Sequence, residues 1–236
     1  MLLLITSDTH MMFGFVQKLV ELGKSEKAKA ILHAGDHLEF TEFGRFPEAE
    51  QVKAATQSMQ GCNLDTRLIT CSGNHDVEGK NKTWLNNLML PGVSADNSHT
   101  LLEDKGLVIL ITSIPYNSPT ASSIAEEGKE KAEAYKAKWI VLTHEPPKDS
   151  KTAGGNGGNL ISRKIINQFS PDYFVCGHRH FAPYLKNGAW NDTMRSTIVL
   201  NPGRKDTQFP NYIWLSINTD GTHSAKWKTN QLRAIR

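Results

Sequence analysis

Short apolar runs recur along the chain, and each ends in a cluster of polar residues. Runs of this length, rich in Val, Ile and Leu, predict strands that are buried within a sheet. These strands are expected at residues 2–6, 30–34, 67–71, 139–143 and 173–176. Between them, apolar residues at helical spacing, or an Ala-, Glu- and Lys-rich composition, predict helices. The helices are expected at residues 14–25, 47–59, 83–90, 121–138 and 160–169.

Further strands are expected towards the middle and the end of the chain, at residues 99–103, 107–114, 184–185, 197–200, 212–217 and 224–228. The pattern contains no repeats and no linker long enough to mark a domain boundary, so we expect a single domain over residues 1–236. The glycine-rich segment 150–159 is open to two interpretations, a mobile loop or a phosphate cradle. We favour the loop, because a phosphate cradle would end in Lys-Ser or Lys-Thr.

Composition narrows the range of partners. The 236 residues are 39% hydrophobic and carry a formal net charge of +3, which suits a small anionic substrate better than a nucleic acid. The three cysteines lack ligand-like spacing and are odd in number, as is typical of a reducing compartment. The first apolar run has no basic residues before it, and no run is long enough to span a membrane. We therefore expect a cytoplasmic protein with no membrane partner.

Residues that can bind metals follow all five of the first-named strands. In order along the chain these residues are Asp8 and His10, Asp36, Asn74 and His75, His144, and His178 and His180. Five of the nine histidines therefore lie directly after a buried strand. Fold stability does not explain this set, because polar groups gathered at one sheet edge need partners. The carboxyl ends of strands are also where open α/β sheets bind ligands.

The types of donor favour two transition-metal ions. Asp-x-His and His-x-His each place two side chains on the same face of an extended segment. Oxygen and nitrogen donors without a thiolate fit manganese, iron or a catalytic zinc better than calcium, magnesium or a structural zinc. Seven candidate ligands are too many for one ion; they are Asp8, His10, Asp36, Asn74, His144, His178 and His180. Two ions about 3.5–4 Å apart can hold the attacking and leaving oxygens of a displacement at phosphorus.

Taken in order, five motifs resemble those of the calcineurin-like metallophosphoesterases. They are Asp8-Thr9-His10, Gly35-Asp36, Gly73-Asn74-His75-Asp76, His144, and Gly177-His178-Arg179-His180. The resemblance implies an α/β (α+β) fold class, a four-layer αββα sandwich of two mixed β-sheets flanked by helices. It also implies a hydrolase of phosphomonoesters, phosphodiesters or both. Such an enzyme would carry two divalent metal ions, with Mn²⁺ as our first expectation and Fe or Zn as alternatives.

The resemblance further implies a role for each residue. One ion would be bound by Asp8, His10, Asp36 and His180, and the other by Asp36, Asn74, His144 and His178. His75, oriented by Asp76, would be the general acid, a role that a histidine suits and that contributes about 10²–10⁴-fold. Asn74 and Arg179 are candidate contacts to the substrate, although a structural salt bridge is an equal alternative for Arg179.

Several other residues have two possible roles. His37 is either an outer partner of the site or, as we prefer, a surface or helix-entry residue. His33 is expected to be a core or sheet-face histidine. Phe13, Phe43 and Trp84 are expected in the core, with the lining of a substrate pocket as the alternative.

A fold alone does not determine function, so we keep a second hypothesis for the function. The alternative to the hydrolase is a non-enzymatic metal-binding scaffold of the same fold that binds protein partners. Missing ligands would favour the scaffold, whereas here the ligand set is complete. We expect the loops at residues 37–47, 77–98 and 150–159 to determine which phosphoester is cleaved.

Overall fold

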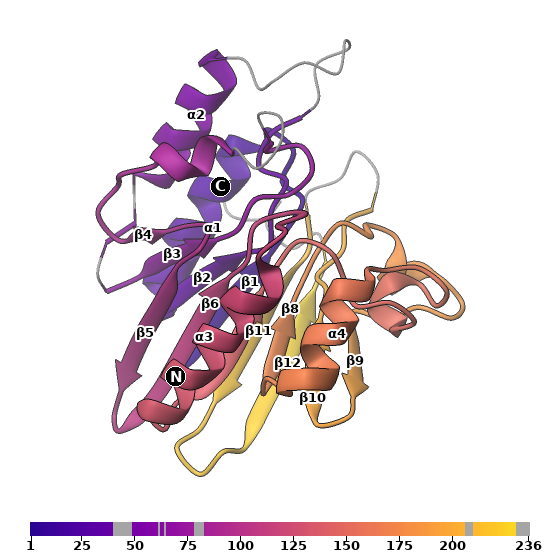
Figure 1. Ribbon diagram of the computed structural model, residues 1–236. Helices are drawn as coiled ribbons and strands as arrows, with labels where there is room; N and C mark the ends of the chain where they lie inside the picture. Colours follow the sequence, from indigo (N-terminus) through magenta and orange to yellow (C-terminus); the bar gives the residue numbers. More distant parts are fainter. Residues whose placement is uncertain (40–48, 61, 64, 78–82, 206–209, 230–236) are drawn as a thin grey trace.

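The computed structural model describes residues 1–39, 49–60, 62–63, 65–77, 83–205 and 210–229 (Figure 1). Within these residues, twelve strands form two six-stranded sheets. In spatial order the first sheet contains β12 (His223–Lys228), β11 (Tyr212–Ile217), β1 (Leu2–Thr6), β2 (Ala30–His33), β3 (Arg67–Thr70) and β4 (Val93–Ser94). Strands β1 to β4 are parallel, while β11 and β12 are antiparallel to their neighbours.

The second sheet is also mixed. In spatial order it contains β5 (His99–Asp104), β6 (Leu107–Ser113), β7 (Lys138–Leu142), β8 (Tyr173–Val175), β10 (Thr197–Leu200) and β9 (Asn191–Met194). Strands β6, β7, β8 and β10 are parallel, and the outer strands β5 and β9 are antiparallel to their neighbours. The parallel strands are near-continuous apolar runs, as expected for strands that are buried on both faces.

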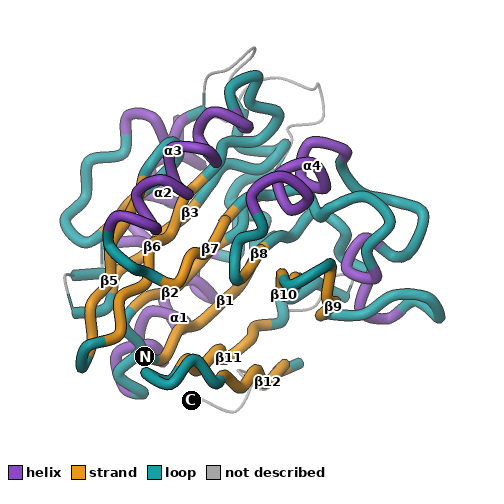
Figure 2. The backbone as a smooth tube through the Cα atoms, turned by 60° about the horizontal axis from the view of Figure 1, so that its bottom comes forward, coloured by secondary structure: helices purple, strands orange, loops and turns teal. Residues whose placement is uncertain are grey.

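Three apolar clusters separate four layers (Figures 1 and 2). Between the sheets, Leu3 of β1 packs in one cluster with Ile111 of β6 and Ile140 of β7. The next residue along β1, Leu4, points to the other face, where α1 (Phe13–Ser25) and α2 (Ala49–Met59) cover the first sheet. On the far face of the second sheet, Val141 packs against α3 (Ala121–Ala134) and α4 (Leu160–Phe169).

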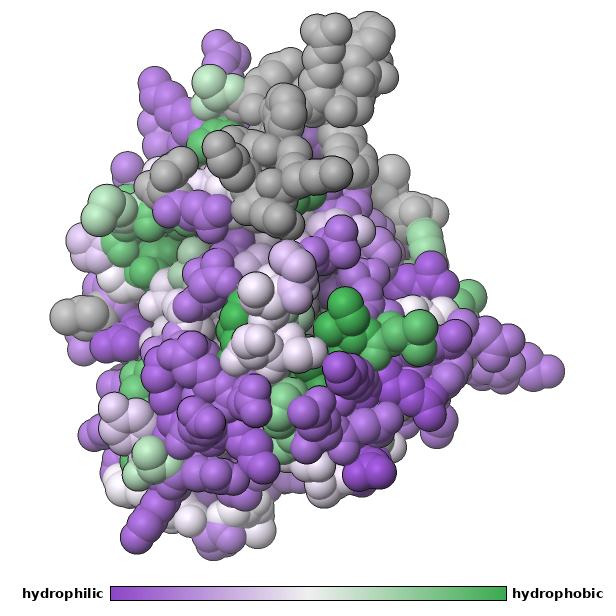
Figure 3. Space-filling model, viewed as in Figure 1, coloured by the Kyte–Doolittle hydropathy of each residue, from purple (hydrophilic) through white to green (hydrophobic). Residues whose placement is uncertain are grey.

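The observed layers confirm the predicted αββα sandwich of two mixed sheets. The charged residues of α3 lie on its outer side, and Figure 3 shows a largely hydrophilic surface there. All three cysteines are buried and free. Within the described residues, no helix is both long enough and apolar enough to cross a membrane. The single-domain organisation and the cytoplasmic location stay predictions.

Several predicted elements differ from the observed ones. The segment 83–90 contains only a short 3₁₀-helix, η1 (Trp84–Asn87), and the strand expected at 184–185 is instead the end of a 3₁₀-helix, η3 (Ala182–Tyr184). Helix α3 ends at Ala134 rather than 138, because Lys136 has a positive φ of 50° and β7 begins at Lys138. The start of the helix predicted at 47–59 lies outside the described residues.

The glycine-rich segment 150–159 is mostly loop, as favoured, although it contains a 3₁₀-helix, η2 (Lys151–Ala153). Its last residue, Asn159, caps α4 by accepting hydrogen bonds from the backbone N–H groups of Ile161 and Ser162. The segment thus ends in a helix cap.

Candidate metal centre

Seven predicted ligands from five strand ends meet at the junction of the two sheets. Strands β1, β2 and β3 are parallel, so the residues that follow them gather at one edge of the first sheet. The residues after β7 and β8 gather in the same way at one edge of the second sheet. The two edges are in contact, since His144 Nε2 lies 3.2 Å from Asp36 Oδ2. Segments up to 172 residues apart in sequence therefore supply one site.

The first group of convergent ligand atoms comprises Asp8, His10, Asp36 and His180, whose donor atoms all lie within 4.8 Å of one another. His10 Nε2 is 3.1 Å from His180 Nε2 and 3.7 Å from Asp36 Oδ2. His180 Nε2 is also 3.1 Å from Asp8 Oδ1. This is the set of residues expected around one ion.

The second group comprises Asp36, His144 and His178, with the side-chain amide of Asn74 between the two histidines. Asn74 Oδ1 lies 3.0 Å from His144 Nε2 and 2.9 Å from His178 Nδ1. Those two ring nitrogens are 3.2 Å apart. Asp36 belongs to both groups, so its carboxylate is the point where they join.

These distances test whether the residues fit metal ions. Two ligand atoms bound at about 2.1 Å and roughly at right angles on one ion lie about 3.0 Å apart. The nitrogen–nitrogen pairs at 3.1 and 3.2 Å match that spacing. Nitrogen lone pairs that face each other at this distance need a proton or a cation between them. The donor set therefore fits two cations, one in each group.

Hydrogen bonds from outside the centre orient two of the ligands. His144 Nδ1 donates to the Ala34 carbonyl at 2.7 Å, so Nε2 is left as the nitrogen that faces Asp36. The backbone N–H of His178 donates to the Asp8 carboxylate at 3.0 Å. The ligands are thus held in place by the backbone of neighbouring loops.

The loops that carry the ligands are tightly packed and conformationally unusual. Asp8, His10, Asp36 and His178 all have positive φ values, between 41° and 64°. Such angles are uncommon for residues other than glycine and cluster at functional sites. Gly73 is required next to them, because a Cβ atom there would lie only 2.1 Å from Asp36 Oδ1. The strand-end sequences therefore fold into turns that bring the ligands close together.

The electrostatic field of the centre is negative. The side chains of Asp8 and Asp36 are buried, and burial raises their pKa values, but His180 and His144 respectively outweigh it and hold both pKa values below the ordinary range. Burial lowers the pKa of His144, yet Asp36 and Asp8 raise it to about 10. His178 has its pKa lowered to about 4 by burial and by His144. A field that draws a proton onto a buried histidine also attracts a divalent cation.

His75 lies at the edge of the centre, with Nε2 3.9 Å from Asp36 Oδ2. Its other nitrogen, Nδ1, is 3.0 Å from Glu39 Oε1. The second oxygen of the same carboxylate, Glu39 Oε2, is 3.1 Å from His10 Nδ1. Glu39 was not predicted, because a lone glutamate three residues after Asp36 has no spacing signal of its own. The only feature in the sequence that could have pointed to it is its position in the same loop as the predicted ligand Asp36.

Asp76 is a buried hydrogen-bond acceptor beside the centre. Among the described residues its carboxylate accepts hydrogen bonds from four backbone N–H groups and from the Trp84 indole. The four N–H groups belong to Asp36, His37, Leu38 and Gly73. The Asp76 oxygens point to these groups and the His75 ring faces Glu39, so the orienting role of Asp76 stays a prediction. Asp76 joins the loops after β2 and β3.

Arg179 forms no ion pair among the described residues. Its Nε donates to the Ala153 carbonyl at 3.4 Å, and its guanidinium packs closely against Gly157. It is exposed and lines a cavity of about 500 Å³ together with His178, His180 and Phe181. The salt-bridge alternative is thus not found in the described part of the chain, and the substrate contact stays a prediction.

The remaining candidates are mostly buried. His33 is buried as expected, and its ring stacks on that of His37 with the centroids 3.7 Å apart. His37 is also buried, so the preference for a surface residue is wrong; its Nε2 is 2.6 Å from Thr70 Oγ1. Trp84 belongs to the core cluster between the first sheet and its helices, and the partly buried Phe13 packs against that cluster, as expected. Phe43 lies outside the described residues.

The fold and the site together define a class of protein, the metal-dependent phosphoester hydrolases built on two facing mixed sheets. The family model for calcineurin-like phosphoesterases matches residues 1–182. The chain belongs to that family. This assignment supports the hydrolase over the non-enzymatic scaffold. A search of curated protein sequences found no match.

Solved structures share the fold at low sequence identity. A putative 5′-nucleotidase from Staphylococcus aureus, in complex with alpha-ketoglutarate, is 14% identical with a TM-score of 0.63, over 97% of this chain and 54% of that one. The protein TT1561 of Thermus thermophilus is 14% identical with a TM-score of 0.62, over 95% of this chain and 97% of that one. Sulfate thiohydrolase SoxB of Thermus thermophilus is 12% identical with a TM-score of 0.58, over 95% and 44%. These similarities support the sandwich architecture.

Proposed function

We propose that this protein is a dinuclear metal-dependent phosphoesterase that hydrolyses small phosphoester substrates. One observation carries the proposal: two groups of convergent ligand atoms share the carboxylate of Asp36. One ion would be held by Asp8, His10, Asp36 and His180, and the other by Asp36, Asn74, His144 and His178. Mn²⁺ is the first candidate for both ions, with Fe or Zn as alternatives.

When bound, two such cations supply a water of lowered pKa and neutralise charge on the phosphoryl oxygens. The chain's own residues do the rest. His144 and Asn74 face the shared carboxylate from the second sheet and from the loop after β3, so a phosphate can be held between the two edges. The mild net charge of +3 is consistent with a small anionic substrate.

His75 is the proposed general acid. Glu39 Oε1 lies 3.0 Å from His75 Nδ1, and His75 Nε2 lies on the side of Asp36. Nε2 is then the atom that hands a proton to the departing alkoxide. A partly exposed ring can regain its proton from water after each turnover; the His75 side chain is 15% exposed. Arg179, which lines a cavity with His178 and His180, is the candidate cation for a substrate oxygen.

The test has two parts. Purified protein loaded with Mn²⁺ is assayed with p-nitrophenyl phosphate and bis(p-nitrophenyl) phosphate, and its metal content is measured after dialysis. We expect two ions per chain and turnover of at least one substrate. Absence of turnover with Mn²⁺, Fe²⁺ and Zn²⁺ alike would refute the hydrolase, and a maximum of one ion per chain would refute the dinuclear centre.

A further inference from the structure

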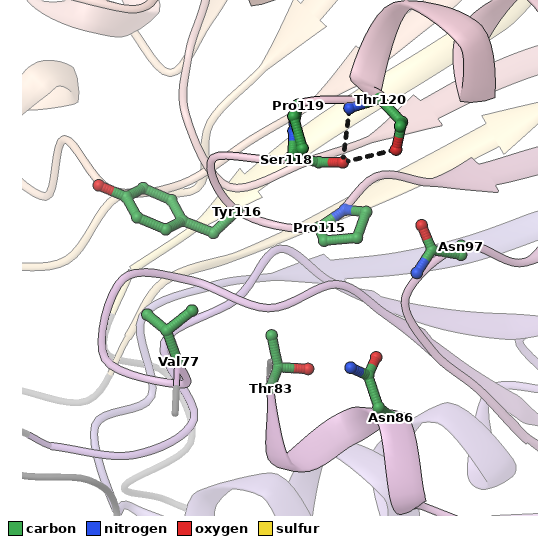
Figure 4. A pocket seen from close by; sticks show the side chains of 9 residues that line it. All are labelled: Val77, Thr83, Asn86, Asn97, Pro115, Tyr116, Ser118, Pro119 and Thr120. Atoms are coloured by element: carbon green, nitrogen blue, oxygen red, sulfur yellow. Dashed lines mark hydrogen bonds between the residues drawn. The ribbon is translucent and has the colours of Figure 1, made fainter. Parts of the chain in front are cut away.

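A cavity of about 270 Å³ lies beside the candidate centre, between the loop after β6 and the segment around η1 (Figure 4). It is lined by Val77, Thr83, Asn86, Asn97, Pro115, Tyr116, Ser118, Pro119 and Thr120. None of these nine residues carries a formal charge. The volume is near the lower end of small-molecule sites, which suits one ring system rather than a large ligand.

One end of the cavity borders the centre. The Tyr116 ring meets the ring of His144 edge-on, with the centroids 6.0 Å apart. The backbone N–H of Tyr116 donates to Ser72 Oγ at 3.1 Å, which ties this wall to the loop that carries Asn74 and His75. Val77 follows His75 by two residues and lies at the same end of the cavity as Tyr116 (Figure 4). A group attached to a phosphate at the centre would enter the cavity here.

The walls of the cavity are apolar, or carry hydroxyl groups that are hydrogen-bonded within the protein. Pro115 and Pro119 present flat apolar rings on one wall (Figure 4). Ser118 Oγ and Thr120 Oγ1 are hydrogen-bonded to each other at 3.1 Å. On the facing wall, Thr83 Oγ1 donates to Asp96 Oδ2 at 2.8 Å. These hydroxyl groups are engaged within the protein, so the walls favour a flat group over a sugar-like one.

Two side-chain amides differ from the rest of the lining. Asn97 lies at the end of the cavity away from Tyr116, and Asn86 lies on the adjoining wall (Figure 4). Within the described residues, neither amide group hydrogen-bonds to the protein. Each amide offers both donors and an acceptor, which is the pattern that reads the edge of a heterocyclic base. The end of the cavity away from Tyr116 can therefore hydrogen-bond to a ligand through uncharged groups.

A second cavity, lined in part by two of the candidate ligands, has a different character. This larger cavity includes the cationic side chain of Arg179 beside His178 and His180. A charged substrate oxygen is expected in the cavity of Arg179 and an uncharged group in the cavity of Figure 4. The two cavities therefore suit different parts of one substrate.

We propose that the cavity of Figure 4 binds the organic ester group of the substrate, and that this group is an uncharged heteroaromatic ring of nucleobase type. The ring lies between the proline wall and Val77, and its polar edge hydrogen-bonds to the amides of Asn86 and Asn97. This inference rests on the proposed function, because it places the phosphate of the same substrate at the metal centre. Nucleoside phosphates are the substrate class that follows.

The experiment compares substrates that differ only in the ester group. The monoester pair is adenosine 5′-monophosphate and glycerol 3-phosphate, and the diester pair is the p-nitrophenyl esters of adenosine 5′-phosphate and of methyl phosphate. The protein loaded with Mn²⁺ is compared with the double variant Asn86→Ala/Asn97→Gly. Glycine is used at position 97 because Asn97 has a φ of 60°, which alanine would strain. Asn167→Ala, at an exposed position on α4, is the matched control.

We expect the double variant to lower kcat/KM for the adenosine substrates by about 10- to 100-fold, since each lost hydrogen bond costs up to about tenfold. Its kcat/KM for the ring-free substrates should stay within about twofold of the unmodified protein. An equal loss on both members of a pair, or no loss on either, would overturn the inference while leaving the hydrolase intact.

Failure of the proposed function gives a different result. If neither member of a pair is hydrolysed, binding of adenosine 5′-monophosphate and glycerol 3-phosphate is measured by calorimetry. Tighter binding of the adenosine compound, lost in the double variant and kept in Asn167→Ala, supports the cavity. Equal binding of the two compounds, or binding of neither, overturns it.

Discussion

At the scale of single residues, Asp36 is the side chain on which the candidate centre depends. Its Oδ2 lies within 3.7 Å of ligand nitrogens in both groups, and its Oδ1 accepts the backbone N–H of His75 at 2.9 Å. A carboxylate can be shared between two cations because it offers two oxygens and a negative charge. An amide at the same position would keep the shape and lose the charge.

We therefore expect Asp36→Asn to weaken binding of both metal ions, by about tenfold or more for each. His10→Ala, which removes a ligand of the first group alone, should lose one ion and keep the other. Metal content is measured after dialysis against graded Mn²⁺ concentrations. An Asp36→Asn variant that lost only one ion would show that the carboxylate is not shared.

Glu39 supplies the second residue-scale prediction. Because it faces both His75 and His10, its removal should disturb the proposed acid and one ligand of the first ion. We expect His75→Gln to lower kcat by about 10²–10⁴-fold with a near-normal metal content. Glu39→Gln should lower kcat by a smaller factor and shift the pH dependence of kcat. Parallel loss of metal and activity in His75→Gln would rule out the acid role.

At the scale of elements, the strands and main helices were predictable because apolar runs and helical stripes reflect burial directly. Strand β9, Asn191–Met194, has no apolar run, since it lies at a sheet edge and is half exposed. The ligand residues were also predictable, because the carboxyl ends of parallel strands meet. The contacts of Glu39 and Asp76 were not, because they depend on how the loops after β2 and β3 fold against each other.

Asp76 provides a prediction at this scale. Its buried carboxylate holds the loops after β2 and β3 and the start of η1 by several hydrogen bonds. Replacing it with alanine leaves these N–H donors without partners, which should lower the free energy of unfolding by about 3 kcal/mol or more. Urea unfolding in EDTA measures the change without any contribution from metal. Asp65→Ala, at an exposed loop position, is the control, and an equal effect of both variants would contradict the bridging role.

At the scale of the whole molecule, the centre joins two sheets that also pack against each other through an apolar cluster. Its ligands come from both sheets, so bound ions should stabilise the folded state over the unfolded chain. At a free Mn²⁺ concentration of about 100 times Kd, one site contributes about 2.7 kcal/mol. For a chain of this size, that corresponds to a rise in Tm of roughly 5–10 °C. Thermal unfolding with Mn²⁺ and with EDTA measures it, and Asp36→Asn should lose the rise.

The metal-free protein should also lose stability as the pH rises above neutral. The folded pKa of His144 is raised from 6.5 to about 10, and that of His180 is raised as well; burial lowers both, but Asp36 outweighs it for His144 and Asp8 for His180. A raised pKa means that the folded state binds its proton more tightly than the unfolded chain does. The resulting stability is complete below about pH 6.5 and declines as the pH rises towards the folded pKa. His33, His37 and His178 have lowered pKa values, so their titration changes the free energy of unfolding only below about pH 6.5.

The measurement is the free energy of unfolding between pH 6.5 and 8 in EDTA, a window that ends before most thiols of the unfolded chain ionise, since their ordinary pKa is about 8.5. We expect it to fall with pH in the metal-free protein. With saturating Mn²⁺ the fall should disappear, because a cation then occupies the position that the proton held. His144→Gln should have a flatter profile in EDTA even if its stability is lower throughout, since the titrating group is gone. A profile in EDTA that is flat or rises with pH would show that the buried carboxylates do not hold a proton on His144, and the electrostatic argument for a cation at this position would fail with it.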